Sequence, residues 1–417
     1  MGLNKIFNQP MQKAGMHVER SLLPGQIIRG NILKIYPKNQ ALIQLGTTQL
    51  HAQLEVALSV GKNYIFQVKE NDPHVHLQVV TEQSNQSNPR NMTNLFNQLG
   101  MKDTEHATRF VNLLFAHHIP FKKEEVTKAL SILEGSKGKQ VAQQVLIEMF
   151  QKRLPFTPSV FQAMLSQHGE VSLTQQIEDL LSFLSHAKIE SAISEKLVGQ
   201  LQDLRTNSQY GQYATHNKAY FLDAIRQTIQ LLGLSYEQNL SEKMVPQQNI
   251  KTLLLQLIQQ NEGKAIQQHA QNFLHIIHGL QLQSVQDSNG FFQSYLTIPG
   301  EKLGLHQDVN LKFESPETSE GKMNEDYCRI FFDLELQALK KTLIDMKVQK
   351  RTVTITVYNQ TENMKQVFQP LELSLKKRLE KLDYQLSNIT YKRLSDKGEK
   401  AIKEIKSTTY RGVDFKI

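Results

Sequence analysis

The spacing of apolar residues changes twice along this 417-residue chain, and that change constrains the fold more than any single motif. Between residues 23 and 80, apolar and polar residues alternate in short runs separated by Gly, Pro, Asn and Asp, which is typical of strands. Between residues 92 and 281, apolar residues recur every three or four positions, which indicates amphipathic helices. Alternation returns after Gly290. The sequence therefore predicts a multi-domain protein with a β, an all-α and an α+β part.

The N-terminal alternation contains five or six short strands, and it predicts a small antiparallel β-barrel over residues 23–80. Residues 1–22 show no sustained period and are interrupted by Pro10 and Gly15, so they are predicted to form a mobile leader. The segment 81–91 has no large apolar residue through its first ten positions and is predicted to be a linker.

The C-terminal alternation gives way to a helical pattern around Pro370, where a helix is predicted to kink or to begin afresh. A last strand, Leu386–Tyr391, follows it. We expect residues 282–394 to form an α+β domain in which one long helix packs on one face of a sheet, and to fold alone. Residues 395–417 are predicted to be a basic tail.

Sequence patterns for catalysis or cofactor binding are weak throughout. Gly135–Lys139 looks like a phosphate-binding loop, but Gln140 stands where such a loop needs Ser or Thr to hold magnesium. His275 and His278 have metal-ligand spacing on a helix with no carboxylate beside them, and Cys328 is the single cysteine. The sequence therefore predicts no enzymatic activity, no catalytic residues, no cofactor and no bound metal.

The charge of the chain is modestly basic, with 48 Lys and Arg against 40 Asp and Glu and a net charge of +8. No apolar run is long enough to span a bilayer, so a soluble, cytoplasmic protein is expected. Tyr64 and Phe66 on a barrel in a basic chain are compatible with oligonucleotide binding. Because both alternate with Ile65 as core residues do, the predicted partner is a protein and not nucleic acid.

Eight apolar positions in the C-terminal part form a recognisable pattern of strand, turn and helix residues. They are Phe332, Leu334, Leu339, Ile344, Val353, Ile355, Leu375 and Leu379. With them, the region 291–394 resembles the C-terminal domain of the flagellar hook-length control protein (FliK-like) family, whose pattern includes a Pro-Glu-x-Leu-Gly turn and a Leu-Arg-x-x-Leu helix. Residues 24–80 and the ending Gly412–Ile417 are similar to those of shorter Gram-positive relatives.

The chain departs from the family pattern at three places. Leu336-Gln337 replaces Pro-Glu, Lys340 replaces the turn glycine, and Asp383 replaces the glycine after the helix. Because a side chain disfavours positive φ, Lys340 predicts a turn of different shape. These losses predict that partner binding persists while any switching activity is lost.

The resemblance implies a non-enzymatic interaction protein of the bacterial flagellum. It implies that residues 282–394 act on the cytoplasmic domain of a type III export-gate protein, or a small homologue of it, to switch export from hook to filament substrates. The eight pattern positions are expected to be structural, with a role in the partner surface as the alternative. Export through the flagellar apparatus is a second fate that the resemblance suggests. Two other functions remain open: a paralogue that binds a gate-like small protein with no motility role, and a nucleic-acid-binding module that uses the N-terminal barrel.

Overall fold

The computed structural model describes residues 22–46, 48–71, 75–83, 89–136, 138–169, 171–187, 191–205, 218–237, 248–260, 263–283, 286–287, 291–316, 318, 324–361 and 364–394. The predicted basic tail, and the predicted leader up to residue 21, lie outside these residues. The chain divides into two compact units, 18–165 and 166–417, the second of which also includes residues 1–17. Each unit is described by itself.

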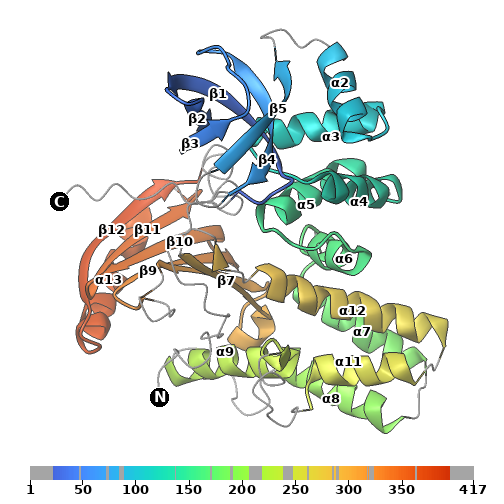
Figure 1. Ribbon diagram of the computed structural model, residues 1–417. Helices are drawn as coiled ribbons and strands as arrows, with labels where there is room; N and C mark the ends of the chain where they lie inside the picture. The colour runs from blue at the N-terminus through green and yellow to red at the C-terminus, as the bar shows by residue number, and fades with distance from the viewer. Residues whose placement is uncertain are drawn as a thin grey trace. The chain divides into compact units, whose positions relative to one another are not determined.

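The first unit contains a set of strands followed by helices (Figure 1). Its elements are β1 (Ile27–Tyr36), β2 (Gln40–Leu45), β3 (Thr48–Leu54), β4 (Asn63–Glu70), β5 (Val75–Gln83), α2 (Pro89–Leu99), α3 (Glu105–Ala116), α4 (Lys123–Glu134), α5 (Lys139–Gln151) and α6 (Pro158–Ser166).

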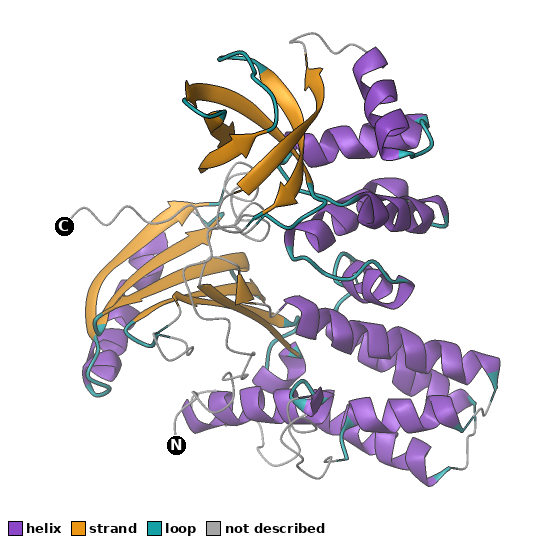
Figure 2. Cartoon of the chain, viewed as in Figure 1, coloured by secondary structure: helices purple, strands orange, loops and turns teal. Residues whose placement is uncertain are grey.

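The second unit begins with helices and continues into a sheet (Figure 1), and helices and strands are coloured apart in Figure 2. Its helices are α7 (Leu173–His186), α8 (Ala192–Arg205), α9 (Lys218–Leu232), α11 (Ile250–Gln259), α12 (Lys264–Gln283), η2 (Gly300–Leu303) and α13 (Met364–Glu380). Its strands are β6 (Gln286–Asp287), β7 (Phe291–Ile298), β8 (Val309–Pro316), β9 (Tyr327–Leu336), β10 (Lys340–Gln349), β11 (Thr352–Asn359) and β12 (Gln385–Arg393).

The five N-terminal strands close into a barrel in the order β1-β2-β3-β5-β4. Alternate side chains such as Ile32, Ile43 and Phe66 point inward and are fully buried. The barrel is not wholly antiparallel as predicted, because β3 and β5 pair in parallel. The parallel pair is needed for closure. β4 pairs with β1 on one side and with β5 on the other, so the remaining gap is closed by β3 pairing with β5.

The predicted linker 81–91 is shorter in the structure. β5 continues to Gln83 because its last residues still pair with β4, with Thr81 opposite Ile65. At the other side, α2 begins at Pro89. The residues between β5 and α2 lie outside the described part of the chain.

Backbone hydrogen bonds join the barrel to the helices of its own unit. The Ile27 amide donates to the Phe121 carbonyl over 2.7 Å, and the Phe121 amide donates back over 3.2 Å. Phe121 is fully buried. The barrel and the helices up to residue 165 therefore group together, whereas the sequence pattern suggested one helical region over residues 92–281.

The C-terminal sheet has seven strands in the order β12-β11-β10-β9-β8-β7-β6. Neighbouring strands from β6 to β11 are antiparallel, while β12 pairs in parallel with β11 after the α13 crossover. α13 runs through Pro370, where the sequence predicted a kink or a new start. The expected fold class of barrel, helical middle region and α+β C-terminal part is confirmed.

A second apolar core joins the sheet to the helices of its unit. Ile225 and Ile229 of α9 pack against Leu296 and Ile298 of β7 and against neighbouring residues of β8. This core groups residues 166–281 with the sheet instead of setting residues 282–394 apart.

The connection between β7 and β8 is anchored to the helices by polar contacts. Lys302, fully buried, donates from Nζ to the Asp203 carbonyl over 3.1 Å, near the end of α8. Asp308 accepts from the Thr174 amide over 3.2 Å, at the start of α7. The loop thus satisfies backbone groups at two helix ends that would otherwise lack partners. In the part of the chain that the structure describes, every helix is too short or too polar to span a bilayer.

Candidate functional site

Seven of the eight pattern positions lie on one face of the C-terminal sheet and on the helix that covers it. Opposite residues across each strand pair share a face, and the pairings place these apolar side chains toward α13 and α9. The core under α13 contains Ile344, Val353, Ile355, Leu375 and Leu379, and the core under α9 contains Phe332 and Leu334. All seven are buried or half-buried, so their role in this structure is to hold the sheet and helices together.

The eighth position, Leu339, lies in the turn between β9 and β10. Gln337, Ala338 and Lys340 are exposed around it. Lys340 has a φ of 54°, in the left-handed region. The expectation that its side chain forces a different turn shape is therefore wrong: Lys340 adopts the conformation for which a glycine is favoured.

Asn359 holds this turn in place, and we call its contacts the Asn359 clamp. Its side chain is fully buried at the end of β11. Nδ2 donates to the Leu339 carbonyl over 2.7 Å and to the Lys341 carbonyl over 3.1 Å. The two carbonyls belong to the residues before and after Lys340, so the clamp holds the backbone on both sides of the strained residue.

The same residue also connects the turn to the neighbouring end of the sheet. Asn359 Oδ1 accepts from the Thr361 amide over 2.7 Å, and its backbone carbonyl accepts from the Leu394 amide over 2.8 Å. One buried residue thus links the β9–β10 turn and the loop before α13 through its side chain, and the end of β12 through its backbone. The sequence contained a signal for it, because Asn359 occupies an inward position in the alternation Val353, Ile355, Val357.

Asp383, the second position at which the family pattern has glycine, also lies in the left-handed region, with a φ of 61°. It ends α13: the Tyr384 amide donates to the Leu379 carbonyl over 3.0 Å, and the Asp383 amide donates to the Glu380 carbonyl over 3.1 Å. Helices commonly end in this way at a glycine. Both replaced glycines therefore keep glycine-like backbone conformations.

The other face of the sheet is polar and carries a network of ion pairs that the sequence reasoning missed. Arg329 donates to Asp345 through Nε and Nη2 over 2.8 and 2.9 Å. Glu314 lies 2.6 Å from Lys312 Nζ and 3.9 Å from Arg329 Nη1. Burial and, next, the Asp345 carboxylate raise the pKa of Tyr358. The signal in the sequence was charge at alternate positions of adjacent strands, interrupted by Phe331 and Leu343.

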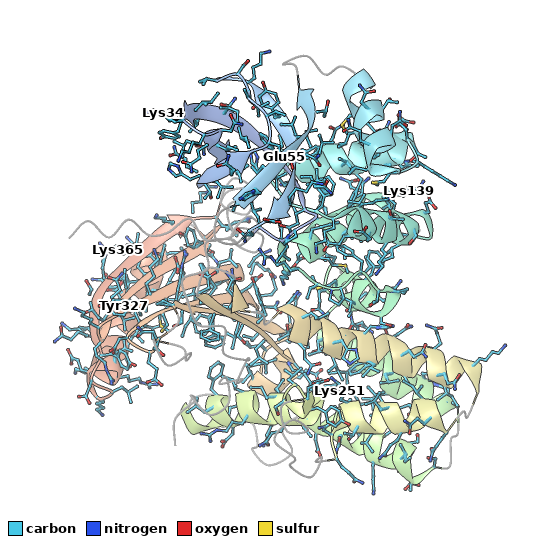
Figure 3. All side chains as sticks on the ribbon, in the orientation of Figure 1. Lys34, Glu55, Lys139, Lys251, Tyr327 and Lys365 are labelled. Carbon is cyan, nitrogen blue, oxygen red and sulfur yellow. The ribbon has the colours of Figure 1, made fainter. Side chains whose placement is uncertain are left out.

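The remaining candidate residues lie in environments that suit structural roles. His278 lies on α12, and burial together with the nearby Lys251 ammonium lowers its pKa to about 4. Lys251 is almost fully buried between helices, pairs with Glu237 and donates to Gln281 Oε1 over 2.8 Å (Figure 3). Burial raises the pKa of the Cys328 thiol to about 11, which leaves it a poor nucleophile at neutral pH. Among the described residues, no three His, Cys, Asp or Glu side chains gather closely enough to hold a metal.

Among known proteins, part of the chain is similar in sequence to a Bacillus protein. Over 186 residues it is 30% identical to the uncharacterized protein YlqG of Bacillus subtilis (strain 168). The matched segment is 44% of this chain and 32% of YlqG, so the chain covers about a third of that relative. No family model and no solved structure matches the chain.

Proposed function

We propose that this protein is a non-enzymatic interaction protein of the hook-length control type. In this proposal, its C-terminal sheet docks the cytoplasmic domain of a flagellar export-gate protein, or a small homologue of it, and takes part in switching the class of exported substrate. The protein then acts in the cytoplasm, with export through the type III apparatus as a further fate.

The proposal rests on one observation above all: Lys340 and Asp383 both have positive φ. These are the two positions at which the family pattern has glycine and this chain does not. A lysine and an aspartate each cost about 1–2 kcal/mol in this conformation, so neither residue would favour it without support from the surrounding structure. The agreement supports a turn and a helix end of the family's shape despite the substitutions. The argument for lost switching, which depended on a changed turn, therefore loses its basis.

We place the docking surface at the β9–β10 turn. Gln337, Ala338 and Lys340 are exposed there, and the Asn359 clamp fixes the backbone that presents them. A preorganised turn loses little conformational entropy on binding, which favours affinity. Seven of the pattern positions supply the scaffold behind this surface, and Leu339 lies within the turn itself.

The test is calorimetric titration of the full chain with the gate domain. Ala338→Asp should weaken binding at least tenfold, because it puts a charge at the centre of the proposed surface. Gln349→Asp is the matched control: it is equally exposed, lies at the opposite end of β10 and should leave affinity unchanged. An absence of binding up to a dissociation constant of about 1 mM contradicts the proposal.

A second measurement distinguishes the switching role from the alternative, a paralogue without a role in motility. Deletion of the gene should change hook length if the protein takes part in switching. Normal hooks, together with intact binding to a gate-like protein, would favour the paralogue.

A further inference from the structure

The outer surface of the barrel over β1, β2 and β3 has a chemistry that the C-terminal proposal does not use. Strand pairing places Lys34, Leu42 and His51 side by side across the three strands, and places Tyr36 beside Gln40 and Gln53. Their neighbours Ile32 and Ile43 point into the core. We call the outer residues Lys34, Tyr36, Leu42, His51 and the adjoining turn residue Lys38 the β1–β3 face.

An aromatic platform lies at the centre of the β1–β3 face. The rings of Tyr36 and His51 are 5.7 Å apart at 32°, and Lys34 Nζ lies 5.2 Å from the Tyr36 ring centre. Lys34 and His51 are exposed and Tyr36 is half-exposed. Figure 3 shows Lys34 on the outside of the barrel. An exposed aromatic ring with a cation beside it offers a flat surface on which a base can stack.

The three strands of this face carry basic but no acidic residues. No Asp or Glu occurs between Gln26 and Leu54, the whole span of β1 to β3, whereas Arg29, Lys34 and Lys38 are cationic. Lys38 lies in the exposed β1–β2 turn, at the end of the face that carries Tyr36. Cations beside a stacking surface on strands that carry no carboxylate complement a polyanion with planar groups. The nearest acidic residue in sequence is Glu55, directly after β3.

The strand order supports the same ligand. The order β1-β2-β3-β5-β4, with β3 parallel to β5, is that of OB-type barrels, which bind oligonucleotides on the face of β2 and β3 and on the adjoining β1–β2 turn. The aromatic residues first considered from the sequence, Tyr64 and Phe66, are buried inside the barrel and face no ligand. The platform is built instead from Tyr36 and His51.

We infer that the β1–β3 face binds single-stranded nucleic acid, with one base stacked on Tyr36 and phosphates paired with Lys34 and Lys38. This function belongs to the first unit and is independent of the gate-protein proposal for the second. It revises the expectation from sequence that nucleic acid is not a partner.

Fluorescence anisotropy of the full chain with labelled dT12 and U12 tests the inference. We expect a dissociation constant below about 100 μM at 100 mM salt for at least one of the two, since weak sequence-independent binding falls in that range. The tighter oligonucleotide distinguishes DNA from RNA. Tyr36→Ala should weaken binding about tenfold, the loss of one stacked base, while Tyr36→Phe should keep it.

The cationic part of the inference has its own variants. Lys34→Gln with Lys38→Gln should lower the slope of log affinity against log salt by about 1.4, the release of two counterions from a single strand. Lys69→Gln is the control, because Lys69 is an exposed barrel lysine on β4, away from the face. No binding at 100 μM, an equal effect of Lys69→Gln, or equally tight binding of a polyglutamate peptide would overturn the inference.

Discussion

The barrel and the C-terminal sheet bury their apolar strand faces in different ways. The barrel closes on itself, so its five strands bury one another's inward side chains and leave no free edge. The sheet is open, and its apolar face is covered by α13, which follows it in sequence, and by α9, which precedes it by some sixty residues. A closed sheet carries its own core, whereas an open one depends on helices from elsewhere in the chain.

The largest expected effect comes from separating these regions. Residues 18–165 should fold when expressed alone, and so should residues 166–394. Residues 282–394 should not, because Leu296 and Ile298 lose Ile225 and Ile229 and the sheet exposes an apolar surface. Circular dichroism melts of the three fragments are the measurement. A cooperative melt of 282–394 at the temperature of the longer fragment would show that the sheet needs no borrowed helix.

Removal of the Asn359 clamp should have the next largest effect on stability, and only in the second unit. Asn359→Ala removes a buried amide and leaves the Leu339 carbonyl without this donor, so we expect the second unit to lose about 2–4 kcal/mol of stability. Asn388→Ala on the exposed side of β12 is the control and should cost less than about 0.5 kcal/mol. Urea titration checks both, with the barrel's own transition unchanged. Equal effects would refute the clamp.

Mild acid should also distinguish the two units. His278 has a pKa of about 4 when folded against 6.5 ordinarily, so the unfolded chain binds the extra proton first. The stability from its neutral form is complete above pH 6.5 and declines as pH falls from 6.5 to 4. After allowance for partial exposure, we expect a loss of about 1–2 kcal/mol in the second unit. Lys251, Glu237 and His275 also act on His278, so the test is the difference between wild type and His278→Asn in melts from pH 7 to pH 4. Parallel pH curves would contradict it.

The smallest effect concerns the replaced glycines. Asp383→Gly and Lys340→Gly should each stabilise the second unit by about 0.5–1 kcal/mol. Glycine adopts positive φ without steric cost, and the greater backbone entropy of glycine in the unfolded chain offsets part of that gain. Lys341→Gly, at a neighbouring strand position, should destabilise. Chemical denaturation of the three variants gives the answer, and a loss of stability in the first two would show that these side chains hold the turns themselves.

Local patterns predicted the elements of both regions but not the contacts between distant ones. Alternation gave the barrel strands, and helical spacing gave α13. The parallel β3–β5 pairing and the α9 cover depend on closure and on long-range packing, which no local period encodes. Lys302 and Asp308 illustrate this: they look like ordinary loop residues until the ends of α8 and α7 are known.

The candidate surfaces were harder to predict than the scaffold behind them. The pattern positions came from the family resemblance, and seven of them also repeat with the period of their strand or helix, as core residues do. Tyr36 and His51 were missed because they lie on β1 and β3, with β2 between them. The distance between their rings depends on how the three strands pair, which the sequence spacing does not show. Asn359 was missed as well, although a polar residue at an inward position of the β11 alternation is a signal that the sequence contains.

The parallel pairing of β12 with β11 sets an order of assembly during synthesis. β9, β10 and β11 follow one another through short turns and can pair as soon as they leave the ribosome, whereas β12 must wait for α13 to be made and to cross over. Until then, β11 has an unpaired edge, and Val353, Ile355 and Val357 lack their helix. A chain that stops before Gln385 therefore presents a ready template for pairing with its own copies.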